Sequence, residues 1–135
     1  MAVAEHFSRR LDAKQEHPNL KHFANLLFGK ADPTLLETLG TEALLAIAKR
    51  GLKLLEKRGA DEVLLRVYTP SYPVDGWEAP FTVIEFCLGD RPFIVDSIKA
   101  ELKRKNVELL YLLHPILSAQ RDGEGKFVAF SDEGQ

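Results

Sequence analysis

The chain has 135 residues, of which 45% are hydrophobic and 28% are charged, and its formal net charge is -2. This composition is ordinary for one soluble globular domain, and the near balance of acids and bases argues against a nucleic-acid-binding protein, which usually presents a basic face. One cysteine, Cys87, excludes an intramolecular disulfide. Without an apolar stretch of 18 residues or a signal-peptide core, the chain is expected to be cytoplasmic and to stay out of the membrane.

Helical patterns dominate the first part of the chain. Residues 1–40 are expected to form a broken helical extension, because glycines and an Asp-Pro pair interrupt their apolar spacing. A stronger helix is predicted over 41–58, where Thr41 is a good N-cap and Gly59 is a stop signal. Its leucines fall on one stripe, and its lysines and arginines lie on the opposite, solvated side.

Two strands follow this helix. Residues 62–70 are rich in β-forming residues, and residues 81–88 are apolar on both faces, which is typical of a central strand. Between them, residues 71–80 contain prolines and a glycine, so a loop with one or two turns is predicted. Cys87, within the second strand, is expected to be an inert buried thiol rather than a nucleophile.

A second helix is predicted over 92–106. Pro92 is tolerated in a first helical turn because its missing amide hydrogen has no intrahelical partner there. Asp90 is expected to cap this helix, and Asn106 is suited to close it in a left-handed conformation.

The last elements are a strand and a hairpin. Residues 107–120 are expected to form an edge or bulged strand, because Pro115 cannot donate to a ladder. An Asp-Gly turn over 121–126 leads into a return strand at 126–130. Residues 131–135 are expected to be a disordered tail.

The order of these elements predicts an α+β fold. From residue 41 it reads α-β-β-α-β-β, which is a ferredoxin-like sandwich in circularly permuted order. In this arrangement residues 41–130 form a four-stranded antiparallel sheet with two helices on one face, and strand 62–70 pairs with strand 81–88. The alternative is an incomplete sandwich that takes its missing elements from another chain or from further sequence.

The turn GDRPFIVDSI, residues 89–98, stands between a strand and a helix, where backbone amides at the positive end of the helix suit a carboxylate. Its Asp90-Arg91-Pro92 resembles the turn of the ACT domains, small sandwiches that bind amino acids and regulate metabolic enzymes. A longer set of motifs is more specific: RVYTP at 66–70, GW at 76–77, LLHPIL at 112–117 and RDGEGK at 121–126. Together they resemble the N-terminal, ACT-like region of the large bacterial NAD-dependent glutamate dehydrogenases.

This resemblance implies a non-catalytic regulatory or assembly domain of an enzyme that interconverts glutamate with 2-oxoglutarate and ammonia. NAD would bind elsewhere in the parent polypeptide, and no cofactor is expected in this segment. The implied partners are other domains of the same polypeptide, further copies in a homo-oligomer, and an amino-acid effector. The alternatives are a free-standing amino-acid-binding module and a purely structural oligomerisation domain.

Catalytic and metal-binding motifs are not found in the sequence. It has no GxGxxG turn for a dinucleotide, and its four histidines lack metal-ligand spacing. Phe93 stands where many amino-acid-binding ACT turns have glycine, so a ligand-binding turn and an empty turn both remain open. Asp96 is expected to face solvent or a partner domain, and Arg91 either to pair with a ligand carboxylate or to be a surface residue. The candidate ligand or interdomain contacts are Asp90, Arg91, Phe93, Asp96, Ser97 and His114.

Overall fold

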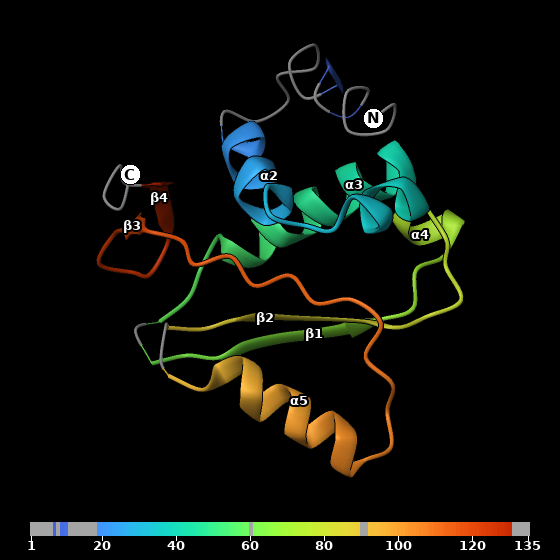
Figure 1. Ribbon diagram of the computed structural model, residues 1–135. Coiled ribbons are helices and arrows are strands. Elements are labelled where there is room, and N and C mark those ends of the chain that lie inside the picture. The colour runs from blue at the N-terminus through green and yellow to red at the C-terminus, as the bar shows by residue number, and fades with distance from the viewer. Residues whose placement is uncertain (1–6, 8, 11–18, 60, 90–91, 131–135) are drawn as a thin grey trace.

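The computed structural model describes residues 7, 9–10, 19–59, 61–89 and 92–130. Two helices, α2 (Leu20–Phe28) and α3 (Pro33–Leu55), pack against each other at one end of the molecule (Figure 1). The hydrophobic core lies between them, and burial of these side chains is the main source of stability in this part of the chain. Its most buried members are Leu20, Phe23, Ala24, Phe28, Leu44, Leu45 and Ala48.

Helix α3 starts earlier than the sequence pattern predicts. Pro33 begins the helix and does not interrupt the chain, because the Asp32 side chain accepts a hydrogen bond from the amide of Thr34 at 2.9 Å and caps the helix. Gly40 then adopts φ 83° and ψ 166°, which kinks the helix next to the predicted start at Thr41. The predicted boundary between extension and domain therefore falls at this kink inside α3.

The predicted antiparallel pair of strands is confirmed. Strand β1 (Leu64–Tyr68) pairs with β2 (Val83–Cys87) in a register that places Arg66 opposite Glu85. The connection between them contains a short helix, α4 (Tyr72–Asp75), where only turns were predicted. Gly76 closes α4 in the left-handed region, at φ 79°.

Helix α5 (Ile94–Arg104) is shorter than the predicted 92–106. Its end confirms the prediction for Asn106, which adopts φ 58°, and the amide of Val107 bonds to the carbonyl of Leu102 at 2.8 Å. Pro92 lies before the helix and not in its first turn. The predicted cap, Asp90, lies outside the described residues. No described residue of α5 is buried, so its apolar stripe is only half covered.

The predicted strand 107–120 is mostly wrong. Residues 107–118 are irregular, and only β3 (Ala119–Arg121) pairs with β4 (Phe127–Phe130), with a register shift between Gln120 and Arg121. The predicted hairpin turn is confirmed, because the amide of Asp122 bonds to the carbonyl of Lys126 at 3.0 Å. Pro115 explains part of the difference, since it lacks the amide hydrogen that a ladder needs.

The fold is α+β as predicted, but the predicted single sheet is not formed by the described residues. They make two separate two-stranded sheets, β1-β2 and β3-β4. Helices α3 and α5 lie on opposite sides of the β1-β2 hairpin instead of on one face (Figure 1). The arrangement that circular permutation requires is therefore not observed.

The physical reason lies at the C-terminal end of α3. The amide of Phe127 donates to the carbonyl of Glu56 at 2.7 Å, and the amide of Arg58 donates to the carbonyl of Gly125 at 2.9 Å. The ring of Phe130 also stacks on Phe23 of α2, with ring centroids 6.3 Å apart. These contacts hold the β3-β4 hairpin against the helices and away from β2. Among the described residues, no helix is long and apolar enough to cross a membrane.

Candidate functional site

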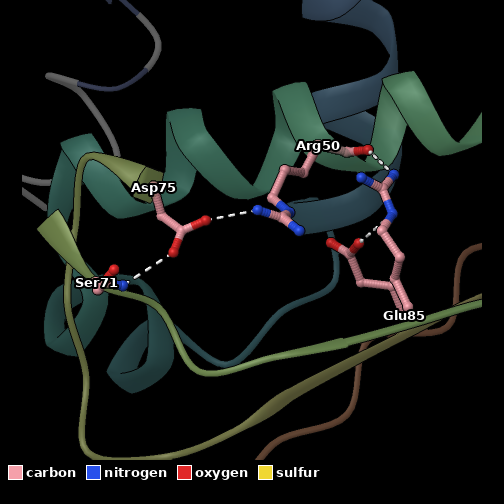
Figure 2. A network of polar contacts seen from close by, with 5 residues as sticks. Arg50, Ser71, Asp75 and Glu85 are labelled. Atoms are coloured by element: carbon pink, nitrogen blue, oxygen red, sulfur yellow. Dashed lines mark hydrogen bonds and ion pairs between the residues drawn. The ribbon is translucent and has the colours of Figure 1, made fainter. Parts of the chain in front are cut away.

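A network of charged side chains joins α3 to the β1-β2 hairpin and to α4 (Figure 2). Arg50 comes from the polar side of α3, Arg66 from β1, Asp75 from the last position of α4, and Glu85 from β2. The strand residues point toward α3 because β1 and β2 place alternate side chains on opposite faces. We name these four residues the charged cluster.

Arg50 is at the centre of the charged cluster. Its Nη1 lies 2.5 Å from Oδ1 of Asp75, and its guanidinium carbon lies 3.7 Å from the centre of the Tyr68 ring. The other carboxylate oxygen of Asp75 accepts the backbone amide of Ser71 at 2.9 Å. The Asp75 side chain is only 3% exposed, so Arg50 supplies the charge that makes its burial possible.

Arg66 connects the hairpin to the same helix. Its Nη2 donates to the backbone carbonyl of Arg50 at 2.9 Å, and its Nε lies 3.5 Å from Oε1 of Glu85. The second contact is an ion pair without hydrogen-bond geometry, since Oε1 of Glu85 is buried and has no hydrogen-bond partner. Arg50 Nε and the Tyr68 hydroxyl are likewise buried without a hydrogen-bond partner.

Burial controls the protonation of the groups around the charged cluster. Burial and the neighbouring Glu85 carboxylate raise the pKa of Tyr68 to about 12. Burial also raises the pKa of Glu85, although Arg66 and Arg50 oppose that shift. Cys87 is half-buried and not fully buried as predicted, and desolvation raises the pKa of its thiol, which fits an inert thiol better than a reactive one.

The charged cluster is suited to holding elements together. Its two cations and two carboxylates balance each other, and the side chains of both arginines are used in protein contacts. It offers no activated nucleophile, and the described part of the chain contains no group of three His, Cys, Asp or Glu residues that could hold a metal ion.

The predicted site around the strand-to-helix turn is only partly described. Asp90 and Arg91 lie outside the described residues. Phe93 precedes α5 in the left-handed region at φ 67°, and its side chain is 73% exposed. Asp96 and Ser97 are exposed in the first turn of α5, where the amide of Ser97 donates to the carbonyl of Phe93 at 2.9 Å.

His114 lies apart from that turn in the sequence, within the irregular segment 107–118, and it is exposed. No hydrogen bond or ion pair within the described ranges joins His114 to Phe93, Asp96 or Ser97. The turn residues therefore form one local group, which does not include His114.

Comparison with known proteins identifies the family. A family model described as "Glutamate dehydrogenase, ACT1 domain" matches residues 23–135, which is most of the chain. The chain belongs to this ACT1 domain family. The resemblance found in the sequence motifs is thus confirmed.

Two curated relatives of this ACT1 domain have the same name. The NAD-specific glutamate dehydrogenase of Pseudomonas aeruginosa is 29% identical over 117 residues, covering 87% of this chain and 7% of the relative. The NAD-specific glutamate dehydrogenase of Halomonas elongata is 25% identical over 122 residues, covering 90% of this chain and 8% of the relative. The chain therefore spans less than a tenth of the length of these relatives. No solved structure matches.

Sequence patterns did not reveal the charged cluster of this ACT1 domain. The helical pattern assigns Arg50 to a solvated face, and Asp75 stands in a segment that was predicted to be a loop. Only Arg66 and Glu85 carried a usable signal, because they are opposite charges at the middle of two strands that were predicted to pair.

Proposed function

We propose that this ACT1 domain is a non-catalytic regulatory and assembly domain of an NAD-dependent glutamate dehydrogenase. It acts by docking to other domains of that polypeptide, and NAD and glutamate bind elsewhere. The observation that carries the proposal is the family match over residues 23–135, together with relatives named NAD-specific glutamate dehydrogenase that are more than ten times longer than this segment. A cytoplasmic location is part of the proposal and is supported by the single unpaired Cys87.

Two features of the structure support docking over catalysis. The side chains of the charged cluster contact one another and the backbone of the same domain. These contacts stabilise the junction of α3 with the hairpin. On the other face of that hairpin, the side on which α5 lies, large apolar side chains remain more than half exposed, including Leu65 and Val67. Contiguous exposed apolar side chains of this kind mark interaction surfaces.

Activity measurements test the proposal in two forms of the protein. The chain alone is expected to give no NADH from glutamate and NAD, whereas a full-length enzyme without this domain is expected to lose its native assembly or its response to effectors. Turnover by the chain alone would contradict the non-catalytic role. A deleted enzyme with unchanged assembly, kinetics and effector response would contradict the regulatory and assembly role.

Amino-acid sensing at the strand-to-helix turn is a second candidate function. It is favoured by the exposure of the Phe93 side chain, since a ring that points into solvent does not fill the space beside the turn. Titration calorimetry with a panel of amino acids tests it, with Arg91→Ala as the variant that removes the expected carboxylate partner. Heat of binding that Arg91→Ala abolishes would support sensing. Silence across the panel would remove this candidate.

A further inference from the structure

A groove lies beside the C-terminal end of α5, at the opposite end of this helix from the strand-to-helix turn. Its volume is about 480 Å³, and its apolar lining comes from Leu102 of the helix together with Val107 and Leu109 of the chain that follows. Val107 and Leu109 are 48% and 38% exposed, so the described part of the chain covers this lining only in part.

Backbone hydrogen bonds fix the shape of the groove. Asn106 ends α5 in the left-handed conformation, at φ 58°. The amide of Val107 donates to the carbonyl of Leu102 at 2.8 Å, and the amide of Asn106 donates to the carbonyl of Lys103 at 3.0 Å. This pair of bonds is a Schellman motif, in which the residue after the left-handed one packs against the last turn of the helix. The groove is therefore formed before any partner binds, and binding does not have to order it.

The apolar surface continues from the groove along the chain. Five of the six residues over 107–112 are large and apolar, and each of these five is more than a third exposed. Within the ranges that the structure describes, the amides of residues 108–112 form no backbone hydrogen bond. A contiguous exposed apolar surface marks an interaction site. We name the groove and residues 107–112 the α5 surface.

The positive charges of α5 fall into two groups. Arg104 and Lys105 both pair with Glu101, at 2.8 and 3.6 Å, so their charges are balanced within the helix. Lys99 and Lys103 lie one turn apart and line the groove, and neither makes an ion pair with a described residue. The side of the groove that α5 provides is therefore positively charged.

The opposite side of the groove carries one acid, Glu108, so the lysines of the lining outnumber its acids by two to one. An apolar segment whose carboxylates face α5 complements this distribution of charge. Such a segment has an ample source in the parent polypeptide, because the curated relatives are more than ten times longer than this domain.

We propose that the α5 surface binds an acidic amphipathic segment from another domain of the same dehydrogenase polypeptide. The apolar side chains of that segment cover residues 107–112, and its carboxylates pair with Lys99 and Lys103. The inference rests on the docking role proposed above, to which it adds the surface used and the chemistry of the partner.

Amide hydrogen exchange in the chain alone and in the full-length enzyme tests the proposal. The amides of residues 108–112 are expected to exchange fast in the chain alone and about tenfold or more slowly in the full-length enzyme, where the partner segment covers them. Lys103→Glu in the full-length enzyme is expected to restore fast exchange, because the new carboxylate repels the acidic segment. Glu108→Lys is expected to slow exchange further, since it removes the acid from the groove.

Arg104→Glu provides a matched control, since it makes the same change of charge at the next position of α5, outside the groove. It is expected to leave the slow exchange of residues 108–112 unchanged. Equal exchange of these amides in the chain alone and in the full-length enzyme would overturn the proposal, as would equal effects of Lys103→Glu and Arg104→Glu.

Carbodiimide cross-linking of the full-length enzyme identifies the partner, because it joins a lysine amine to a carboxylate in contact with it. Lys99 or Lys103 is expected to be joined to an Asp or Glu outside residues 1–135. Cross-links from these lysines only to residues 1–135 of a second copy would assign the surface to self-association and overturn the proposal. Failure here is distinct from failure of the assembly role, which is measured by deleting the whole domain.

Discussion

At the scale of single residues, the least tolerant position is Asp75. Its side chain is almost completely buried, and its charge is matched by Arg50 at 2.5 Å. A buried carboxylate that loses its cation keeps the cost of desolvation without the compensating attraction. The arginine is therefore expected to matter more than its partly exposed position on α3 suggests.

Arg50→Met tests this dependence. It removes the cation that neutralises Asp75 and the contact over Tyr68, and it is expected to lower the free energy of unfolding by about 2–3 kcal/mol. Urea denaturation measures the loss, with Lys53→Met on the exposed side of the same helix as the control. In the Arg50→Met protein, Asp75→Asn is expected to lower the free energy of unfolding by less than it does in the unmodified chain. Additive losses would show that the two side chains do not stabilise each other.

Glu85 makes stability depend on pH with a defined sign. Because burial raises the pKa of Glu85 in the folded chain above its ordinary value of 4.5, the unfolded chain releases this proton first. The contribution of Glu85 to stability is thus fully present below about pH 4.5 and is lost as the pH rises through the folded pKa. The free energy of unfolding of the unmodified chain, relative to Glu85→Gln, is expected to fall as the pH rises above about 4.5. A difference that stays constant or rises with pH would contradict this assignment.

At the scale of elements, α5 begins under backbone strain. Phe93 holds φ 67° at the position before the helix, where a residue with a Cβ is unfavourable, and its exposed ring contributes little packing in return. Phe93 is also the position at which many amino-acid-binding ACT turns have glycine. The structure supplies the conformational reason for a glycine.

Phe93→Gly is expected to stabilise the chain by about 0.5–1 kcal/mol, because relief of the left-handed strain exceeds the added freedom of glycine in the unfolded chain. Phe93→Ala is the matched control, since it removes the same ring but keeps the Cβ. Thermal unfolding of the three proteins compares them. Equal stability of the glycine and alanine variants would show that backbone strain is not stored at this turn.

At the scale of the whole molecule, the β3-β4 hairpin is held against the end of α3. Nη1 of Arg121 donates to the carbonyl of Leu55 at 2.7 Å and to the carbonyl of Gly125 at 2.9 Å. Gly125 has φ 86°, and a Cβ at this position would lie 2.5 Å from the carbonyl oxygen of Arg58. The junction therefore depends on close approach of two backbones, which only glycine permits.

Gly125→Ala tests this junction. The added methyl group is expected to separate the hairpin from Arg58 and to lower the free energy of unfolding by about 2 kcal/mol, since strain in the left-handed region adds to the clash. Gly123→Ala, in the same turn but with nothing within 4 Å of the added carbon, is expected to be nearly neutral. Amide hydrogen exchange at Arg58 and Phe127 reports whether the hairpin has detached. Slow exchange at both amides in the Gly125→Ala protein would count against the junction.

The sequence by itself determined the family, the α+β class, the β1-β2 pairing and the left-handed end of α5 at Asn106. These features depend on motifs and on contacts between neighbouring segments, where spacing and residue type carry the physical signal. Only the tertiary structure decided that the strands form two sheets, and that Arg50 and Asp75 meet between α3 and α4. Both outcomes depend on groups far apart in the chain, such as Phe127 and Glu56, whose pairing leaves no periodic pattern in the sequence. The surface along β1 depends on both sequence and fold. Val63, Leu65 and Val67 alternate with other residues in the sequence, and the tertiary structure leaves their side chains exposed.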